Sequence, residues 1–230
     1  MAMRRLDRSP RDARPLQIRV YEELRDLIVT GELAEDAQLV QEQVAEALGV
    51  SRTPVRDGLN QLAHEGLVTW IPGRGYLVNA LSERDVVEVF QARRLLEVEA
   101  ARLAYGKHDQ ALISRLNALI EDMAATADDD ITRLFELNRS FHRTLVEPCG
   151  NSLLLKMLDT LWDHPVNRRI TGSYMAAAGT AAEMIGEHRD LLAAAAGTDE
   201  ARFLDLVAHH ITTGYDDAAR AVTGAEKATT

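Results

Sequence analysis

Four polar side chains in the C-terminal part of the chain have a spacing that suits a metal site. Asn138 and His142 are four residues apart, so on a helix both side chains point the same way, one turn apart. His188 and His210 each belong to a further helical pattern. Three imidazoles and an amide oxygen inside a helical bundle can coordinate a divalent metal and leave positions open for a ligand. A single helical histidine is usually only a hydrogen-bonded or surface residue, so spacing alone leaves both interpretations open.

A second set of polar residues belongs to a segment that combines a helix end, a tight turn and a helix start. Gly49 follows an apolar helical pattern and can adopt the left-handed conformation that ends a helix. Ser51 or Thr53 can cap the next helix, and Pro54 falls in its first turn, where a backbone N–H has no intrahelical partner. Residues 49–56 are therefore typical of the centre of a helix-turn-helix.

The helix after this turn has two different faces. Val55 and Leu59 belong to an apolar stripe that predicts a buried face. Arg52 and Arg56 are four residues apart and share another face, with Thr53 near its N-terminal end. Two guanidinium groups and a hydroxyl at the start of an exposed helix suit contacts in a DNA major groove.

The patterns around this segment predict a winged helix. Helices are expected at residues 15–30, 39–48 and 52–65. Two β-rich stretches follow, at residues 67–71 and 76–78. The turn cluster Pro72-Gly73-Arg74-Gly75 separates them and predicts a hairpin. Arg74 lies between two glycines and can approach a DNA phosphate, whereas the alternative is an ordinary solvated turn residue.

The rest of the chain predicts an all-helical second domain. Residues 80–83 form a linker, and Ser82 with Asp85 three positions later is a signal for a helix start. Helical patterns are found at residues 83–105, 109–127, 130–147, 151–170, 175–197 and 199–222. We expect a mainly α protein made of a flexible basic arm (1–14), a winged helix-turn-helix with a β-hairpin wing (15–79), an all-α helical bundle (84–222) and a tail (223–230).

Charge and composition favour a cytoplasmic protein that binds DNA locally. The formal net charge is −10, but residues 1–19 carry six arginines against two aspartates, and residues 81–230 carry most of the acidic excess. A locally basic region can contact DNA phosphates even when the net charge of the whole protein is negative. The single Cys149 excludes an intramolecular disulfide and favours a reducing compartment. We see no targeting signal and no membrane span, which needs ~20 apolar residues.

The motif SRTPVRDGL, residues 51–59, resembles that of the GntR superfamily of bacterial transcriptional regulators. The family motif usually ends with Glu-Ala, where this chain has Asp57-Gly58, and both arginines remain. Gly58 inside a helix is expected to cost roughly 0.5–1 kcal/mol relative to alanine. We expect DNA contacts from the residues of the turn, the recognition helix and the wing, namely Ser51, Arg52, Thr53, Arg56, Gly73 and Arg74.

Residues 84–220 are similar to the FCD effector domain, found in one branch of that superfamily. The matching segments are RRLLE (93–97), NRSFHRTL (138–145), GN (150–151), EHRDLLAAAAGTD (187–199) and HHI (209–211). The resemblance implies that residue 138, usually aspartate, and three histidines bind a metal that helps to bind a small carboxylate effector. Here Asn138 replaces that aspartate, so one anionic ligand becomes neutral and metal affinity should fall.

The expected cofactor is a divalent transition metal bound by Asn138, His142, His188 and His210. Zinc is the first candidate, and nickel and manganese are the alternatives. Arg93 is the candidate counter-charge for the effector, because a guanidinium matches a carboxylate in a bidentate fork.

The two resemblances together predict a ligand-responsive transcriptional regulator and no enzyme. A homodimer would place two recognition helices in adjacent major grooves of operator DNA, and a small organic acid in the bundle would change their spacing. One alternative keeps the DNA binding and makes the bundle a dimerisation module only. A metal-dependent enzyme is the other, but no Glu or Asp is placed by motif as a general base beside the histidines, and the winged helix would have no role.

Overall fold

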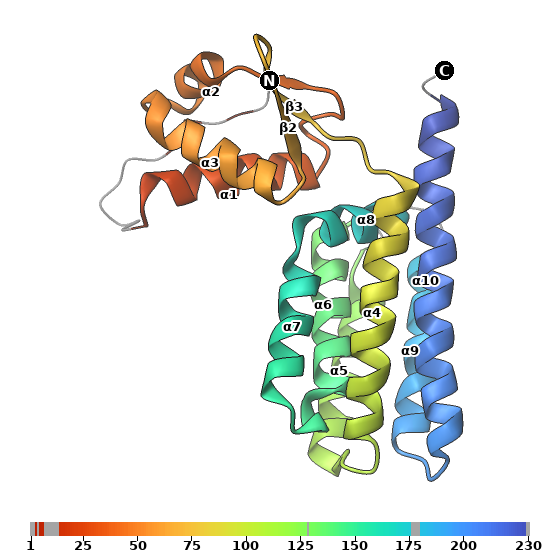
Figure 1. Ribbon diagram of the computed structural model, residues 1–230. Coiled ribbons are helices and arrows are strands. Elements are labelled where there is room, and N and C mark those ends of the chain that lie inside the picture. The colour runs from red at the N-terminus through yellow and green to blue at the C-terminus, as the bar shows by residue number, and fades with distance from the viewer. Residues whose placement is uncertain (1–2, 4, 7–13, 128, 176–179, 229–230) are drawn as a thin grey trace. The chain divides into compact units, whose positions relative to one another are not determined.

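The computed structural model describes residues 3, 5–6, 14–127, 129–175 and 180–228. The chain divides into two compact units, residues 1–81 and 82–230, and their boundary falls inside the predicted linker. We call them the N-terminal unit and the C-terminal unit (Figure 1). Residues 1–2, 4 and 7–13 of the predicted basic arm lie outside the described residues. Within the arm, the backbone N–H of Leu6 donates to the carbonyl of Leu48 at 3.1 Å.

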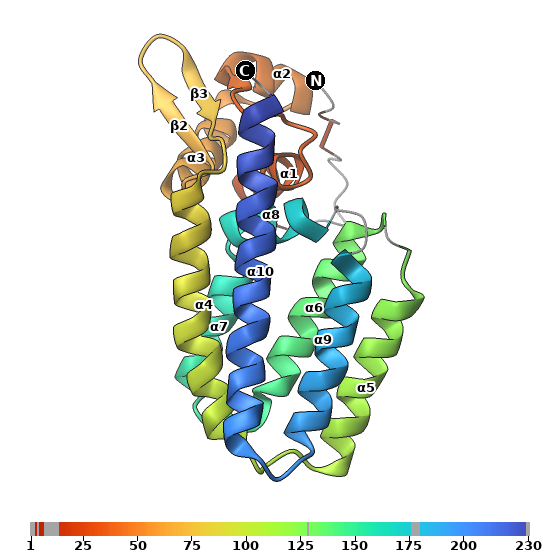
Figure 2. The same ribbon diagram turned by 90° about the vertical axis from the view of Figure 1, so that its right-hand side faces the viewer.

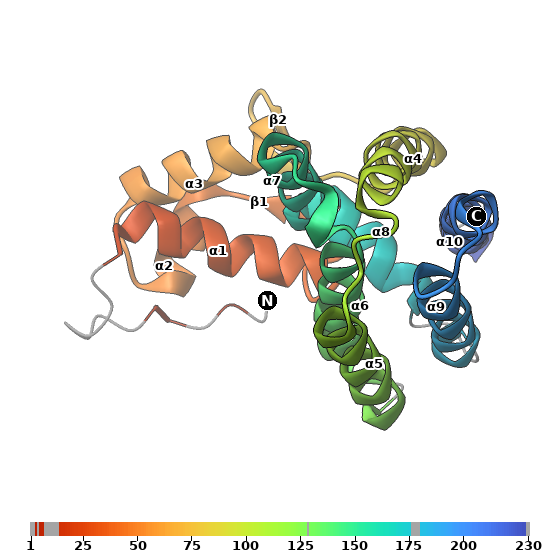
Figure 3. The same ribbon diagram turned by 90° about the horizontal axis from the view of Figure 1, so that it is seen from below.

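The N-terminal unit is a winged helix-turn-helix, as predicted. Its described helices are α1 (Leu16–Val29), α2 (Gln41–Leu48) and α3 (Arg52–His64). Its strands are β1 (Gln38–Leu39), β2 (Val68–Ile71) and β3 (Gly75–Val78), which form an antiparallel sheet in the order β1-β3-β2. Figure 3 shows α1 and α3 side by side, and they pack directly on each other. Leu24, Leu48 and Leu59 are fully buried between these elements.

Strand β1 was missed by the sequence patterns, which placed residue 39 in a helix and predicted only a two-stranded hairpin. Gln38 and Leu39 instead pair with Leu77 and Tyr76 of β3. Asp36 starts this pairing with a positive φ of 61° and donates its backbone N–H to the carbonyl of Val78 at 2.9 Å. Both contacts are distant in sequence, so a local pattern carries no sign of them.

Gly58 is buried where α3 crosses α1. A Cβ atom at this position would lie 3.2 Å from the backbone nitrogen of Tyr21 and 3.2 Å from Cγ1 of Val20. The close approach of two backbones therefore accounts for glycine inside this helix. The helix-propensity cost of Gly58 is offset, at least in part, by closer helix packing.

The C-terminal unit is all-helical among its described residues. The helices are α4 (Glu83–Ala104), α5 (Gln110–Ala125), α6 (Ile131–Leu145), the 3-10 turn η1 (Glu147–Cys149), α7 (Ser152–Asp163), α8 (Pro165–Met175), α9 (Thr180–Ala195) and α10 (Glu200–Ala228). Figure 2 shows α4 beside α10 and α5 beside α9, and both pairs are in contact. Helix α6 packs on α5 and also contacts α4, α8 and α9, so it lies at the centre of the bundle.

Local signals set most helix starts in this unit. Ser82 and Asp85 form a capping box at the start of α4, with the side chain of Ser82 accepting from the N–H of Asp85 at 3.2 Å. The predicted helix 151–170 is in fact two helices, α7 and α8. His164 between them is extended, because the proline at 165 disfavours a helical conformation in the preceding residue.

The ends of the last two helices differ from the predicted ranges. Helix α9 is described from Thr180, and residues 176–179 of the predicted helix lie outside the described residues. Helix α10 continues to Ala228, so residues 223–228 are helical although we expected a tail there. No proline interrupts this segment, and its one glycine costs only about 1 kcal/mol in a helix. No described helix is both long and apolar enough to span a bilayer.

Candidate DNA interface and metal site

The turn between α2 and α3 has the predicted geometry. Gly49 ends α2 with a left-handed backbone, φ 69° and ψ 32°. Ser51 is the N-cap residue of α3 and is extended, but its hydroxyl accepts no capping hydrogen bond. Ser51 and Thr53 are both exposed at the start of the helix. Their hydroxyls are therefore accessible to an external partner at this end of α3.

The two arginines of α3 are exposed and only loosely held. Arg52 contacts Glu42 of α2 at 2.5 Å, and the side chain of Arg52 is 67% exposed. Arg56 lies 3.4 Å from Asp57, and its side chain is 57% exposed. Ion pairs at the surface contribute about 0–1 kcal/mol, so both guanidinium groups can exchange these carboxylates for DNA at little cost.

The wing has a tip made of Gly73, Arg74 and Gly75. Gly73 has a φ of 75° and Gly75 a φ of 90°, which side chains rarely adopt. A Cβ at Gly75 would lie 2.7 Å from the carbonyl oxygen of Leu39, so β1 also requires glycine there. Arg74 between them is exposed. On the same hairpin Trp70 is 57% exposed, a feature the sequence patterns did not single out.

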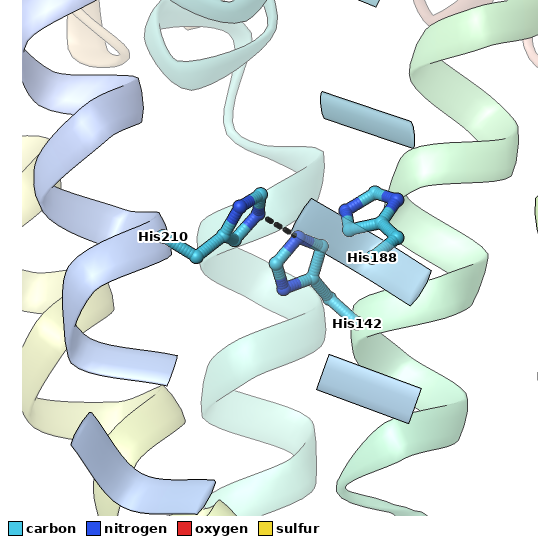
Figure 4. A group of neighbouring side chains, drawn as sticks. All are labelled: His142, His188 and His210. Carbon is cyan, nitrogen blue, oxygen red and sulfur yellow. Dashed lines mark hydrogen bonds between the residues drawn. The ribbon is translucent and has the colours of Figure 1, made fainter. Parts of the chain in front are cut away.

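The structure brings the three predicted histidine ligands together inside the C-terminal unit. His142 comes from α6, His188 from α9 and His210 from α10, and their rings point toward one another (Figure 4). One ring nitrogen of each can be chosen so that all three lie within 4.8 Å of one another. The Nε2 atoms of His142 and His210 are 3.1 Å apart. These three side chains could hold a metal ion.

Two carboxylates contact rings of this histidine cluster and orient them. Glu97 of α4 contacts Nδ1 of His142 at 2.8 Å. Glu187 of α9 contacts Nδ1 of His210 at 2.5 Å. A carboxylate on one ring nitrogen fixes the tautomer that offers the other nitrogen to a metal. Sequence reasoning quoted both glutamates as parts of motifs but assigned them no function.

The protonation states follow from burial and from these contacts. Burial raises the pKa of Glu97, but Arg93 and His142 oppose it and hold the pKa at about 2, so this carboxylate is ionised. Burial lowers the pKa of His142 to about 4 in spite of Glu97, so the ring is neutral near pH 7. Nδ1 of His142 therefore carries the proton that Glu97 accepts, and Nε2 offers a lone pair.

Nδ1 of His210 contacts Glu187, so Nε2 is the ring nitrogen of His210 that faces His142. The two Nε2 atoms face each other at 3.1 Å, a distance that needs a proton or a cation between them. His188 adds to this demand, because it is fully buried and neither of its ring nitrogens has a hydrogen-bond partner in the part of the chain that the structure describes. Burial also lowers the pKa of His188 well below its usual value, so it is neutral. A metal ion would satisfy all three rings.

Asn138 lies beside this cluster, as its position one turn before His142 predicted. Its side chain is 2% exposed, and Oδ1 has no hydrogen-bond partner among the described residues. A buried carbonyl oxygen without a partner costs about 1–3 kcal/mol. The donor set of three imidazoles and one amide oxygen therefore fits a borderline divalent cation, zinc among them.

Arg93 is buried, and its charge is already matched. Nε of Arg93 contacts Glu97 at 2.7 Å, and both side chains are 2% exposed. The guanidinium carbon also lies 4.2 Å from the ring centre of Trp162. Arg93 and Asn138 line one pocket together with His210. Arg93 thus lies at a pocket beside the histidine cluster, and its role as an effector contact stays a prediction.

Two family models match the chain. One is described as FCD domain and matches residues 88–213, and the other, described as bacterial regulatory proteins, gntR family, matches residues 16–78. The HTH-type transcriptional repressor GlaR of Escherichia coli K12 is 26% identical over 202 residues, which is 84% of this chain and 91% of the relative. A probable D-xylose utilization operon transcriptional repressor of Paenarthrobacter nicotinovorans is 33% identical over 150 residues, 62% of this chain and 65% of the relative.

Solved structures agree with these matches. Escherichia coli McbR/YncC has a TM-score of 0.63 at 25% identity and is matched over 87% of this chain and 95% of its own. A GntR regulator from Rhodococcus sp. RHA1 has a TM-score of 0.65 at 23% identity over 91% and 98% of the two chains, which supports the fold. The chain therefore belongs to the gntR family of bacterial regulatory proteins, in the branch with an FCD domain, and is a DNA-binding transcriptional regulator and not an enzyme.

Proposed function

We propose that a small organic acid, bound beside a divalent metal in the C-terminal unit, controls the affinity of this regulator for its operator. The observation that carries the proposal is the cluster of three imidazoles, whose ring nitrogens can be chosen to lie within 4.8 Å of one another, with both nitrogens of His188 unpartnered among the described residues. A metal held by Asn138, His142, His188 and His210 would supply positive charge and open coordination positions for a carboxylate.

The residues of the chain have separate roles in this proposal. Glu97 and Glu187 fix the two histidine tautomers, so the ligands are oriented before a metal arrives. Arg93 offers a second positive charge at the pocket, and Glu97 keeps its side chain in place. Because Arg93 and Asn138 of the pocket lining are buried, an acid bound against them is held in surroundings where charge–charge attraction is stronger than in water.

Control of DNA binding requires a coupling between the two units. We propose a homodimer that places two copies of α3 in adjacent major grooves and two wings against the DNA backbone. Ser51, Arg52, Thr53 and Arg56 would contact the major groove, and Gly73 and Arg74 the backbone. The effector changes operator affinity only if it binds one dimer geometry better than the other.

Thermal unfolding of the purified protein tests the site. The stripped protein is prepared by chelation, reloaded with zinc, nickel or manganese, and unfolded with and without a panel of small organic acids. A ligand that binds only the folded state raises the melting temperature. We expect an acid to raise it in the metal-loaded protein and to have no effect after chelation. If the protein takes up no metal on reloading, that result favours the alternative, in which the bundle only dimerises.

Operator affinity with and without the active acid then tests the coupling. His188→Ala and His210→Ala should keep operator binding but lose about 1–3 kcal/mol of coupling, the usual range of such linkage. His209→Ala is the matched control, because His209 adjoins His210 but is exposed. If a folded His210→Ala protein still responds fully to the acid, the sensory site lies elsewhere.

A further inference from the structure

Trp70 of the wing is exposed although it shares a face of the sheet with buried residues. Trp70 on β2 is paired with Tyr76 on β3, and residues directly opposite each other in an antiparallel pair lie on the same face. On that face Val68, Val78 and Tyr76 are at most 3% exposed, whereas Trp70 is 57% exposed. Strand β2 lies at one edge of the sheet. Trp70 therefore presents an aromatic ring to solvent at this edge.

The same edge of the sheet adjoins α3, the helix that carries the predicted DNA contacts. Strand β2 packs on α3 (Figure 1). The hydroxyl of Tyr76 donates to Oδ1 of Asn60 on α3 at 2.6 Å. Asn60 is exposed and lies one turn after Arg56 on the same face of the helix. Tyr76 thus connects Trp70 to the exposed face of α3.

In the other direction along the hairpin, Trp70 leads to the tip of the wing. Arg74 follows Trp70 by four residues and is exposed. Single exposed apolar side chains are common on protein surfaces, so exposure alone calls for no partner. The position of Trp70 is what matters, because it lies between the cationic groups of Arg56 on α3 and Arg74 on the wing. A partner that spans both cations and covers this ring is polyanionic.

Double-stranded DNA has the shape that this arrangement needs. A sugar–phosphate strand separates each major groove from the neighbouring minor groove. A duplex with α3 in its major groove and Arg74 against its backbone therefore runs one such strand past the edge of the sheet. Trp70 lies at that edge.

We infer that Trp70 contacts the sugar–phosphate backbone of the operator between α3 and the tip of the wing. The inference rests on the proposed docking of α3 and the wing, and is independent of the metal and the effector. The indole Nε1 is a donor that suits a phosphate oxygen, and the ring offers apolar surface to a deoxyribose. Backbone contacts carry no sequence information, so Trp70 contributes affinity for DNA of any sequence.

Affinities for two duplexes test the contact. One duplex is selected from a random pool by the wild-type protein, and the other has the same length and a scrambled sequence. Trp70→Ala should weaken binding to both by about tenfold, the scale of one hydrogen bond to a charged group, so that their ratio stays unchanged. Trp70→Phe keeps a ring but lacks the donor, and its affinity should lie between those of wild type and Trp70→Ala. Thr69→Ala is the matched control, because Thr69 is exposed on the same strand but on the opposite face of the sheet.

Quenching of tryptophan fluorescence by acrylamide shows whether DNA covers Trp70. The chain has two tryptophans, and Trp162 is only 1% exposed, so the indole that acrylamide reaches is that of Trp70. Operator DNA should protect this indole from the quencher in the wild-type protein. In Trp70→Phe, where Trp162 alone remains, DNA should leave quenching unchanged. A tryptophan that only stabilised the hairpin would stay accessible in the complex.

The outcomes separate this inference from the docking on which it rests. Wild-type affinity in folded Trp70→Ala, or a loss of affinity confined to the selected duplex, would overturn the inference. An indole that stays accessible in the wild-type complex would overturn it as well, and this measurement needs no variant to fold. Arg56→Ala is titrated in parallel. If Arg56→Ala weakens operator binding and Trp70→Ala does not, the docking of α3 stands without Trp70. If neither variant weakens it, the proposed docking fails too.

Discussion

Arg52 and Arg56 of the N-terminal unit keep their guanidinium groups in solvent, whereas Arg93 of the C-terminal unit is buried between Glu97 and Trp162. The exposed arginines each contact one surface carboxylate. Arg93 belongs to a continuous chain of contacts that runs through Glu97 to His142 and on to His210. The exposed arginines are therefore available to an external partner, whereas Arg93 belongs to a buried network of charges.

The difference teaches how each unit should respond to substitution. An exposed side chain contributes to stability through weak, independent contacts, so its removal should affect only what it binds. A buried charge that shares partners supports the whole network, and its removal leaves other charges unpaired. We expect substitutions in the buried network of the C-terminal unit to affect folding, and substitutions of the exposed arginines of α3 to affect only binding.

The largest effect is expected at Glu97. Glu97→Ala leaves Arg93 buried without its counter-charge and His142 without its acceptor, which should lower the free energy of unfolding by about 3–5 kcal/mol. Denaturant unfolding followed by circular dichroism measures it. Glu99→Ala is the matched control, because Glu99 lies on the same helix in an exposed ion pair with Arg102 and should cost no more than about 1 kcal/mol. Equal losses of unfolding free energy in the two variants would show that Glu97 does not support a network of buried charges.

Arg56→Ala should affect DNA binding and leave folding unchanged. If Arg56 reads a base edge, its loss should weaken specific binding by roughly 1–3 kcal/mol. A gel-shift titration on duplexes selected from a random pool by the wild-type protein measures this loss. The control is Arg102→Ala in the C-terminal unit, which should bind like wild type. Unchanged affinity in Arg56→Ala would remove α3 as the recognition element.

The two units also differed in how much the sequence could predict. In the N-terminal unit the turn, the recognition helix and the wing were predicted because Gly49, Pro54 and Gly73 act through their own backbone preferences. Strand β1 was missed because its partners, Tyr76 and Leu77, are distant in sequence. The fold class was confirmed, since helical periodicity is also a local property.

In the C-terminal unit the sequence indicated the ligands but not what orients them. Asn138 and His142 share a helix, so their common direction follows from spacing alone. Glu97 and Glu187 meet the histidines only after four helices have packed, and no pattern along the chain shows that. Glu183 and Asp217, which line the pocket as well, were missed for the same reason, since they come from two different helices, α9 and α10.

Asn138→Asp tests the residue in which this chain departs from the usual ligand set. A carboxylate holds a divalent cation more firmly than an amide oxygen, so the variant should bind zinc at least about tenfold more tightly, or ~1.4 kcal/mol. Calorimetric titration of the stripped protein measures it. Asn167→Asp on α8 is the control for a new buried carboxylate, because Asn167 is also fully buried but belongs to no ligand set. Equal or weaker zinc binding in Asn138→Asp would place residue 138 outside the coordination sphere.

The smallest effect is expected at Gly58, which is buried where α3 packs on α1. Alanine is a better helix former than glycine by roughly 0.5–1 kcal/mol, but its Cβ would lie 3.2 Å from the backbone nitrogen of Tyr21 and would push α3 from α1. We therefore expect Gly58→Ala to bring no stabilisation. In α9, Gly186 has nothing within 4 Å of a Cβ position, so Gly186→Ala should stabilise its unit by roughly 0.5–1 kcal/mol. Thermal unfolding of both variants decides it, and equal stabilisation would show that α1 and α3 can separate without loss.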